Sequence, residues 1–112
     1  MMQANPTEFN PHYAEDALTH EQVRDIVGGA LLEFGAPWCG HCQAAQAAVE
    51  EALIGHNSLP HLKVYDGKGK RLGRAFQVKL WPTLIKIHNG EEVARLVRPL
   101  LAEEIRQLIE QK

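Results

Sequence analysis

The feature that most constrains this chain is a short apolar run that leads into its only two cysteines. Residues Ala30–Phe34 are almost continuously apolar, which is typical of a central strand covered on both faces. Gly35–Pro37 interrupts the run, and from Cys39 onward apolar residues recur at helical spacing. The two cysteines, Cys39 and Cys42, are therefore expected where a buried strand turns into a helix.

The rest of the chain alternates predicted helices and strands. Each element is indicated by its hydrophobic period, by a capping pattern or by turn residues at its ends. This order predicts an α/β fold in which a central mixed β-sheet is flanked by helices in three layers. In chain order, the further predicted elements are a helix from Thr19 to Gly28, a strand over 62–65, a short helix within 70–77, a hairpin of strands 83–88 and 92–97, and a closing helix marked by Leu101, Ile105, Leu108 and Ile109.

Length and composition fit one domain. The chain has 112 residues, of which 45% are hydrophobic, enough to bury roughly two thirds of its unfolded surface. We expect a single domain over residues 18–112, after a partly ordered lead-in over 1–17 that holds a short edge strand near 12–14. The first 18 residues show no secretory pattern and no segment is long enough to span a membrane, which predicts a cytoplasmic protein. The net charge of −2 gives no case for nucleic acid, and nothing demands more than a monomer.

The cysteine pair has the spacing of a reversible two-electron carrier. Cys39 would begin the helix, where unpaired backbone N–H groups and the helix dipole stabilise a thiolate, so Cys39 is the expected nucleophile. Cys42, one turn further on, would resolve the mixed disulfide, and Gly40 leaves room for an incoming sulfur. His41 can place positive charge beside the Cys39 thiolate, which favours the dithiol and makes the disulfide a stronger oxidant. The other five histidines have no such context and are expected to be ordinary.

Glu33 is the unusual residue of the apolar run, because an acid there is costly to bury without a task. Beneath the cysteine pair it could take the proton of Cys42 during resolution, and its removal should stabilise the fold. Lys63, in the next predicted strand, is a plausible charged neighbour. Lys63 also begins a basic stretch over 63–79, which is either solvated surface or a docking surface for acidic partners.

Two segments together resemble a known family. Leu31–Cys42 looks like the active-site segment of the thioredoxin superfamily, in the form typical of protein disulfide isomerase domains, with Cys-Gly-His-Cys between Cys39 and Cys42. Trp81–Thr83, followed by an apolar strand and Asn89–Glu91, looks like the second landmark of that family. The resemblance covers about residues 17–111 and implies a thioredoxin fold and dithiol–disulfide exchange with protein substrates.

The resemblance also implies roles for single residues. It makes Cys39 the nucleophile and Cys42 the resolving cysteine, and it places Glu33 at the buried acid of the family, with Lys63 as the lysine that often pairs with it. In the same way it implies a cis bond before Pro82. The substrate groove would then be formed by Trp38 at the rim, the Trp81 backbone, Pro82 and Thr83.

The chain departs from the family at residues around the expected groove, which bear on the choice of partner. His41 stands where ordinary thioredoxins have Pro, Trp81 is bulkier than the usual residue, and Arg98-Pro99 replaces a small step containing Gly. The leading expectation is a thioredoxin-like reductase that is recharged by a thioredoxin-reductase-type or other dithiol donor. The alternative is a non-catalytic redox sensor or adaptor that uses the fold to bind a partner.

A metal-binding module is the remaining class of function to consider. Structural zinc needs four ligands, commonly from two pairs, and the sequence has no second CxxC and no HxxxH. An iron–sulfur cluster would need two chains to supply four thiolates. We therefore expect no metal and no cofactor other than the redox-active disulfide of Cys39 and Cys42.

Overall fold

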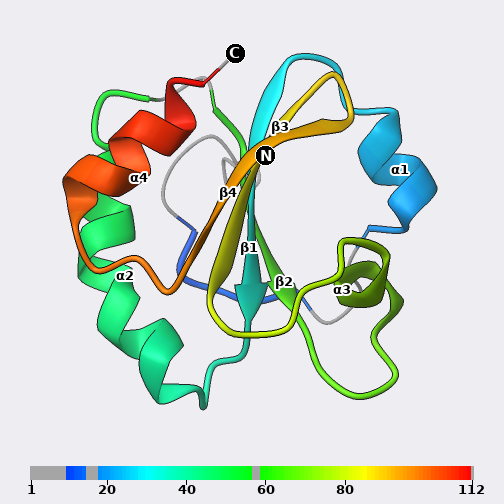
Figure 1. The fold of residues 1–112 in the computed structure, drawn as a ribbon, viewed down its shortest axis with the longest axis horizontal. Coiled ribbons are helices and arrows are strands. Elements are labelled where there is room, and N and C mark those ends of the chain that lie inside the picture. Colours follow the sequence, from blue (N-terminus) through cyan, green and yellow to red (C-terminus); the bar gives the residue numbers. More distant parts are fainter. Residues whose placement is uncertain (1–9, 15–17, 57–58, 112) are drawn as a thin grey trace, which may run out of the picture.

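The computed structural model describes residues 10–14, 18–56 and 59–111. A four-stranded sheet stands between two pairs of helices, with α2 and α4 on one face and α1 and α3 on the other (Figure 1). This confirms the predicted three-layer α/β arrangement with a mixed sheet. In chain order the elements are α1 (His20–Arg24), β1 (Gly29–Gly35), α2 (Gly40–Leu53), β2 (His61–Tyr65), α3 (Arg71–Ala75), β3 (Thr83–His88), β4 (Glu91–Val97) and α4 (Ala102–Ile109).

Strand β1 is at the centre of the sheet, whose strand order is β2-β1-β3-β4. It pairs in parallel with β2 and antiparallel with β3, and β3 continues into β4 as an antiparallel hairpin. Because β1 is covered on both faces, its residues Ala30–Phe34 are all fully buried. The almost continuous apolar run in the sequence is the direct consequence of this position.

Alternate residues of β1 contribute to two separate cores. Leu31 packs with residues of α2 and α4, including Val49 and Ile105. Leu32 and Phe34 point the other way and join a second cluster, which Val23 of α1 completes. The charged Glu33 lies on the same face as Leu31, toward α2, because successive strand residues alternate between faces.

Helix α1 is shorter than the sequence predicts. The capping box at Thr19 is present, with Thr19 Oγ1 accepting from Gln22 N at 3.1 Å and Gln22 Oε1 accepting from Thr19 N at 2.9 Å. The helix nevertheless ends at Arg24, and Val27, which the helical pattern included, is 89% exposed. Only Val23 within α1 is buried, so the sheet supports a single turn and a half of helix.

The segment over residues 10–14 lies along the outer edge of β2. Ala14 N donates to Lys63 O at 2.9 Å, and Tyr65 N donates to Ala14 O at 3.1 Å. The edge strand expected near 12–14 is thereby reduced to one isolated parallel bridge, between Ala14 and Val64. The domain boundary at residue 18 stays a prediction, but the chain already contacts the sheet before that point.

Candidate active site

The two cysteines lie at the junction of β1 and α2, where both are free thiols. Cys39 caps the N-terminus of α2, and its Sγ accepts a hydrogen bond from Cys42 N at 3.2 Å. The Cys39 sulfur thus lies at the end of the helix where backbone N–H groups are unpaired. Cys39 is 8% exposed and Cys42 is 1% exposed, so the sulfur that the helix end stabilises is also the more accessible one.

Cys42 is held in the opposite electrostatic state. Burial, and after it a hydrogen bond with Cys39, raises the pKa of Cys42 to about 11, although the Ala36 backbone and the Tyr13 hydroxyl act in the lowering direction. At neutral pH Cys42 is therefore a thiol and must lose a proton before it can attack. The pair thus combines a sulfur that accepts an N–H at a helix end with a buried partner that is protonated at neutral pH.

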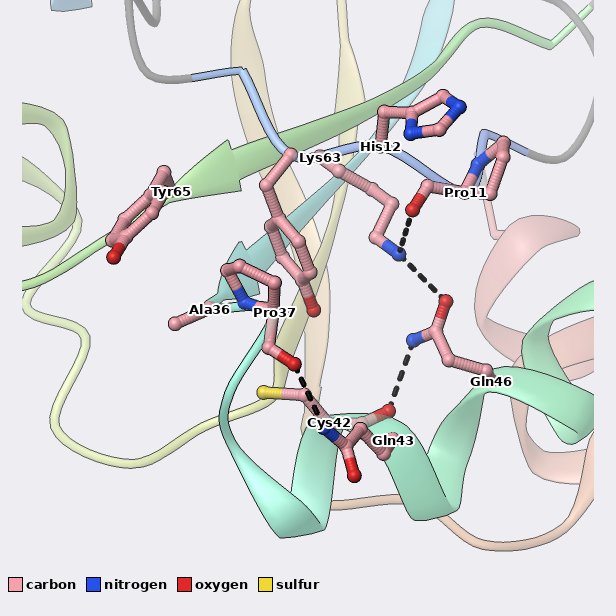
Figure 2. Close-up of a pocket in the computed structure, with 10 residues that line it drawn as sticks. Pro11, His12, Ala36, Pro37, Cys42, Gln43, Gln46, Lys63 and Tyr65 are labelled. Carbon is pink, nitrogen blue, oxygen red and sulfur yellow. Dashed lines mark hydrogen bonds between the residues drawn. The ribbon is translucent and has the colours of Figure 1, made fainter.

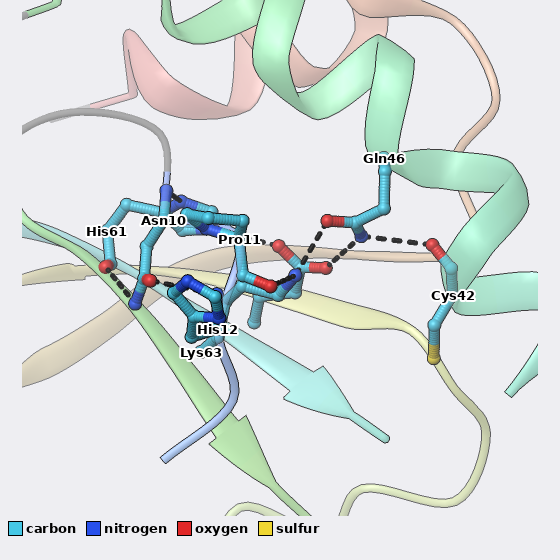
Figure 3. Close-up of polar contacts among 8 residues, drawn as sticks. Asn10, Pro11, His12, Cys42, Gln46, His61 and Lys63 are labelled. Atoms are coloured by element: carbon cyan, nitrogen blue, oxygen red, sulfur yellow. Dashed lines mark hydrogen bonds and ion pairs between the residues drawn. The ribbon is translucent and has the colours of Figure 1, made fainter. Parts of the chain in front are cut away.

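Glu33 is fully buried and both its oxygens face donors. Gln46 Nε2 donates to Oε2 at 2.9 Å, and His61 Nε2 lies 2.8 Å from Oε1. Asn10 N donates to His61 Nδ1 at 2.9 Å, so Nδ1 is an acceptor and the proton of a neutral ring is on Nε2 (Figure 3). Each carboxyl oxygen of Glu33 therefore has its own described hydrogen-bond partner.

Lys63 fixes the orientation of Gln46, which is a residue of α2. Lys63 Nζ donates to Gln46 Oε1 at 2.6 Å and to Pro11 O at 3.3 Å (Figure 2). Because an ammonium can only donate, the Gln46 oxygen must face Lys63, and its NH₂ is left for Glu33 and for Cys42 O at 3.0 Å. Burial lowers the pKa of Lys63, and Glu33 opposes that shift. The expected neighbours Glu33 and Lys63 are thus joined through Gln46.

A cavity of about 360 Å³ opens beside Cys42. Pro11, Gln46 and Lys63 line its other side (Figure 2). The Gln46 and Lys63 side chains make that side of the cavity polar, and the cavity is large enough for water.

Sequence reasoning missed two members of this network, Gln46 and His61. His61 was expected to be ordinary, and the structure corrects this, because it is fully buried against Glu33. Both carried a weak signal: Gln46 is four residues after Cys42 on one helix face, and His61 is two residues before Lys63 on one strand face. Lys63 is itself buried, so it does not belong to a basic docking surface over 63–79.

Two tryptophans form one wall of the site. Trp38 is 64% exposed, and its ring meets that of Trp81 edge to face at 5.4 Å between centroids. Trp38 Nε1 donates to Tyr65 Oη at 3.0 Å, and Trp81 Nε1 donates to Asp66 Oδ2 at 2.9 Å. Both rings are thereby held upright beside the cysteines, with Tyr65 and Trp81 packed against the cysteine cluster.

The Trp81–Pro82 peptide bond is cis, as the resemblance implied. Thr83 follows it as the first residue of β3, buried, with its hydroxyl donating to Leu80 O at 2.6 Å. The Trp81 carbonyl accepts from Arg98 Nε at 2.7 Å. A backbone acceptor at the groove is therefore covered by a side chain that the sequence marked as a departure from the family.

Gly40 and His41 lie exposed at the start of α2. Apart from the chain neighbours of Gly40 and the backbone of its own helix, no heavy atom lies within 4 Å of the point where a Cβ on Gly40 would sit. Within the described ranges 10–14, 18–56 and 59–111, no three His, Cys, Asp or Glu side chains gather as a metal ion requires. In the same residues no helix is long and apolar enough to cross a bilayer.

Comparison with known proteins places this arrangement in context. Residues 11–111 match the thioredoxin family model. Thioredoxin-1 of Caenorhabditis elegans is 30% identical over 79 residues, which cover 70% of this chain and 68% of that protein. A protein disulfide-isomerase of Aspergillus niger is 37% identical over 82 residues, 71% of this chain but 16% of its own length.

The chain spans about a third of another relative, a thioredoxin domain-containing protein of Theileria parva, with 32% identity over 79 residues. Among solved structures, reduced thioredoxin 2 from Pseudomonas aeruginosa PAO1 has 47% sequence identity and a TM-score of 0.77, covering 85% of this chain and 88% of that one.

Proposed function

Because the chain belongs to the thioredoxin family of thiol–disulfide oxidoreductases, we propose that it reduces disulfide bonds in protein substrates with the dithiol of Cys39 and Cys42. The observation that carries the proposal is the difference between the two sulfurs. The Cys39 sulfur accepts an N–H at a helix N-terminus, whereas Cys42 is buried, protonated and beside a carboxylate network.

In the first step the Cys39 thiolate attacks one sulfur of a substrate disulfide. A bond forms between Cys39 and that sulfur, the substrate S–S bond breaks, and the other substrate sulfur leaves as a thiolate that takes a proton from water. The Trp38 and Trp81 rings provide an apolar wall for the peptide. Pro82 and Thr83 hold the Trp81 backbone beside the cysteines.

In the second step Cys42 resolves the mixed disulfide. Its proton passes to Glu33, directly or through water in the cavity, while Gln46, His61 and Lys63 hold the carboxylate in place. The Cys42 thiolate attacks Cys39 Sγ, the Cys39–Cys42 disulfide forms, and the second substrate sulfur is released. Two electrons have then moved from the protein dithiol to the substrate.

A dithiol donor must restore the reduced protein. We propose a thioredoxin-reductase-type enzyme or another dithiol donor for this step, and a cytoplasmic setting in which the surrounding pool supplies net reduction. His41 tunes the couple by placing charge beside Cys39, and no cofactor beyond the active-site disulfide takes part.

Reduction of insulin disulfides, with dithiothreitol as donor, tests the proposal. With dithiothreitol, wild type should accelerate insulin precipitation and Cys39→Ser should be inactive. With insulin and no dithiothreitol, reduced Cys42→Ser should accumulate a mixed disulfide with the insulin chain. Accumulation on Cys39→Ser instead would reverse the two roles, and a wild type no faster than dithiothreitol alone would reject the reductase.

A redox-dependent adaptor is the second candidate, because Arg98 already covers the Trp81 carbonyl that an extended peptide would use. It is favoured if wild type shows no turnover but binds one protein tightly in one redox state only. Arg98→Ala then distinguishes the two functions: it should raise the rate of insulin reduction in a reductase and leave an inactive adaptor inactive.

A further inference from the structure

The hydroxyl of Tyr13 is buried beside the cysteines without a partner. Among the side chains that the structure describes, it is the buried polar atom that makes no hydrogen bond. An unpaired buried hydroxyl is costly and calls for an explanation. The proposed exchange between Cys39 and Cys42 assigns no role to Tyr13, which in the sequence is only an aromatic residue of the lead-in.

Tyr13 is held firmly for a residue so near the start of the chain. Its neighbour Ala14 is hydrogen-bonded to β2 on both sides, through Lys63 O and Tyr65 N. Lys63 Nζ lies 4.2 Å from the centroid of the Tyr13 ring, a cation–π contact that fixes the ring from the side of the Glu33 network. The ring packs on the cluster of Ala36, Cys39 and Cys42.

Gly35 shows how close the hydroxyl comes to the resolving sulfur. A Cβ at this position would lie 2.5 Å from Cys42 Sγ and 2.9 Å from Tyr13 Oη. The two groups therefore share the space that the missing side chain of Gly35 leaves open. Burial above all, and then the negative charges of Glu33 and Cys42, raise the pKa of Tyr13, so its hydroxyl keeps its proton and is available as a donor.

We propose that Tyr13 is a catalytic residue of the resolving step, whose hydroxyl donates a hydrogen bond to Cys42 Sγ as that thiol becomes a thiolate. The inference rests on the proposed dithiol exchange and deepens it. The thiol is a weak acceptor and leaves the hydroxyl unpaired, whereas the thiolate is a strong one and a charge-assisted bond forms only then. The hydroxyl is thus paired at the moment when the sulfur needs it.

Protons and electrons balance without any loss from Tyr13. The Cys42 proton goes to Glu33, the Tyr13 hydroxyl points its own proton at the sulfur, and the Cys42 thiolate attacks Cys39 Sγ. When the new S–S bond forms, the substrate thiolate leaves and the hydroxyl returns to its unpaired state.

Release of thionitrobenzoate from a mixed disulfide on Cys39 measures this step alone. In Tyr13→Phe the release should slow about tenfold at neutral pH, since a hydrogen bond to a charged group is lost. The pH at which release reaches half its maximum should also rise, whereas the attack of Cys39 on free dithionitrobenzoate should keep its rate. Tyr65→Phe is the matched control, because it removes a phenol hydroxyl that serves Trp38, and it should not move the pH profile of release.

The outcomes separate the two proposals. If wild type neither releases thionitrobenzoate nor reduces insulin, the proposed function fails. If wild type releases it and Tyr13→Phe has the same rate and pH profile, the role of Tyr13 is overturned. Should Tyr13→Phe not fold, fluorotyrosine at position 13 keeps the shape with a more acidic hydroxyl. Release should then be faster than in wild type, and an unchanged or slower release would count against the inference.

Discussion

Two buried ionisable side chains on one face of the sheet have opposite surroundings. Lys86 of β3 is paired with Leu31 of β1, and Glu33 is two residues from Leu31, so both charges lie on the side of α2 and α4. The partners described for Glu33 are side chains, His61 and Gln46. Those described for Lys86 are backbone carbonyls of Ile109 and Gln111, at the end of α4.

The hydrogen-bond partners of a buried charged side chain, more than its burial, therefore distinguish a catalytic role from a structural one. Carbonyl oxygens do not take up protons, so Lys86 satisfies the last turn of α4 and anchors that helix to the sheet. Burial lowers the pKa of Lys86, and its described hydrogen-bond partners are carbonyl oxygens that exchange no proton. Glu33 is two hydrogen bonds from Cys42 O, through a Gln46 that Lys63 orients, and lies in a network that borders a cavity at Cys42.

The largest effect is expected when the Cys42 sulfur is removed. Cys42→Ser should stop turnover and leave mixed disulfides on Cys39, because no group remains to resolve them. In that background Glu33→Gln should not change the rate at which Cys39 is modified, since Glu33 acts only on the second step. Trapping of mixed disulfides on non-reducing gels, with stopped-flow modification of Cys39, measures both; an additional loss from Glu33→Gln would place the carboxylate in the first step.

Glu33→Gln alone should slow resolution by about a hundredfold at neutral pH, the usual contribution of a positioned general base. Rapid-quench measurement of mixed-disulfide decay gives the rate. Burial of the charge alone would predict that Glu33→Ala stabilises the fold. Because His61 and Gln46 lose their acceptor in this variant, we expect instead that its free energy of unfolding falls by about 1–3 kcal/mol. Urea unfolding checks this, and a more stable variant would mean that those bonds contribute little.

The protonated state of Cys42 also predicts how the stability of the reduced protein depends on alkaline pH. The pKa of Cys42 rises from an ordinary 9.0 to about 11 on folding, so the folded protein holds a proton that the unfolded chain releases. The resulting stability is fully present below pH 9 and is lost as the pH rises through about 11, by roughly 2–3 kcal/mol. Urea unfolding of the reduced protein across this range should show the loss, and Cys42→Ala should lack it; equal slopes would contradict the assignment.

Lys86→Met is the matched control for Glu33→Gln and has the smallest expected effect. It leaves the carbonyls of Ile109 and Gln111 without their described donor, which should cost about 1 kcal/mol, while its stem still fills the core. Resolution of the mixed disulfide should keep its wild-type rate. A slowing comparable to that of Glu33→Gln would show that any buried charge on this face affects the chemistry, and would contradict a catalytic role that is specific to Glu33.

The part of the site that could be predicted from sequence is the part written in consecutive residues. The β1–α2 junction could be predicted from the apolar run through Phe34, its break before Trp38 and the helical period after Cys39. Glu33 could be singled out because it is the one charged residue in that run. Resemblance to the family added the cis bond before Pro82, which no local pattern contains.

What could not be predicted depends on contacts between distant segments. His61 stands just before the predicted strand over 62–65, and only the pairing of β2 with β1 sets its ring next to Glu33. Tyr13 lies in a segment with no period, and only its pairing along β2 brings it to Cys42. The length of α1 was overestimated because Val27 fits the helical spacing, yet no layer of the fold extends far enough to cover it.

The most direct test of the central claim is a redox titration of the Cys39–Cys42 pair against glutathione at neutral pH. We expect one reversible intramolecular disulfide with a potential at or below the cytosolic glutathione potential, about −220 to −260 mV by biochemical extraction, so that the dithiol can reduce protein disulfides. A potential well above that range, or no intramolecular disulfide at all, would contradict a reductase and point to a disulfide donor or to an adaptor.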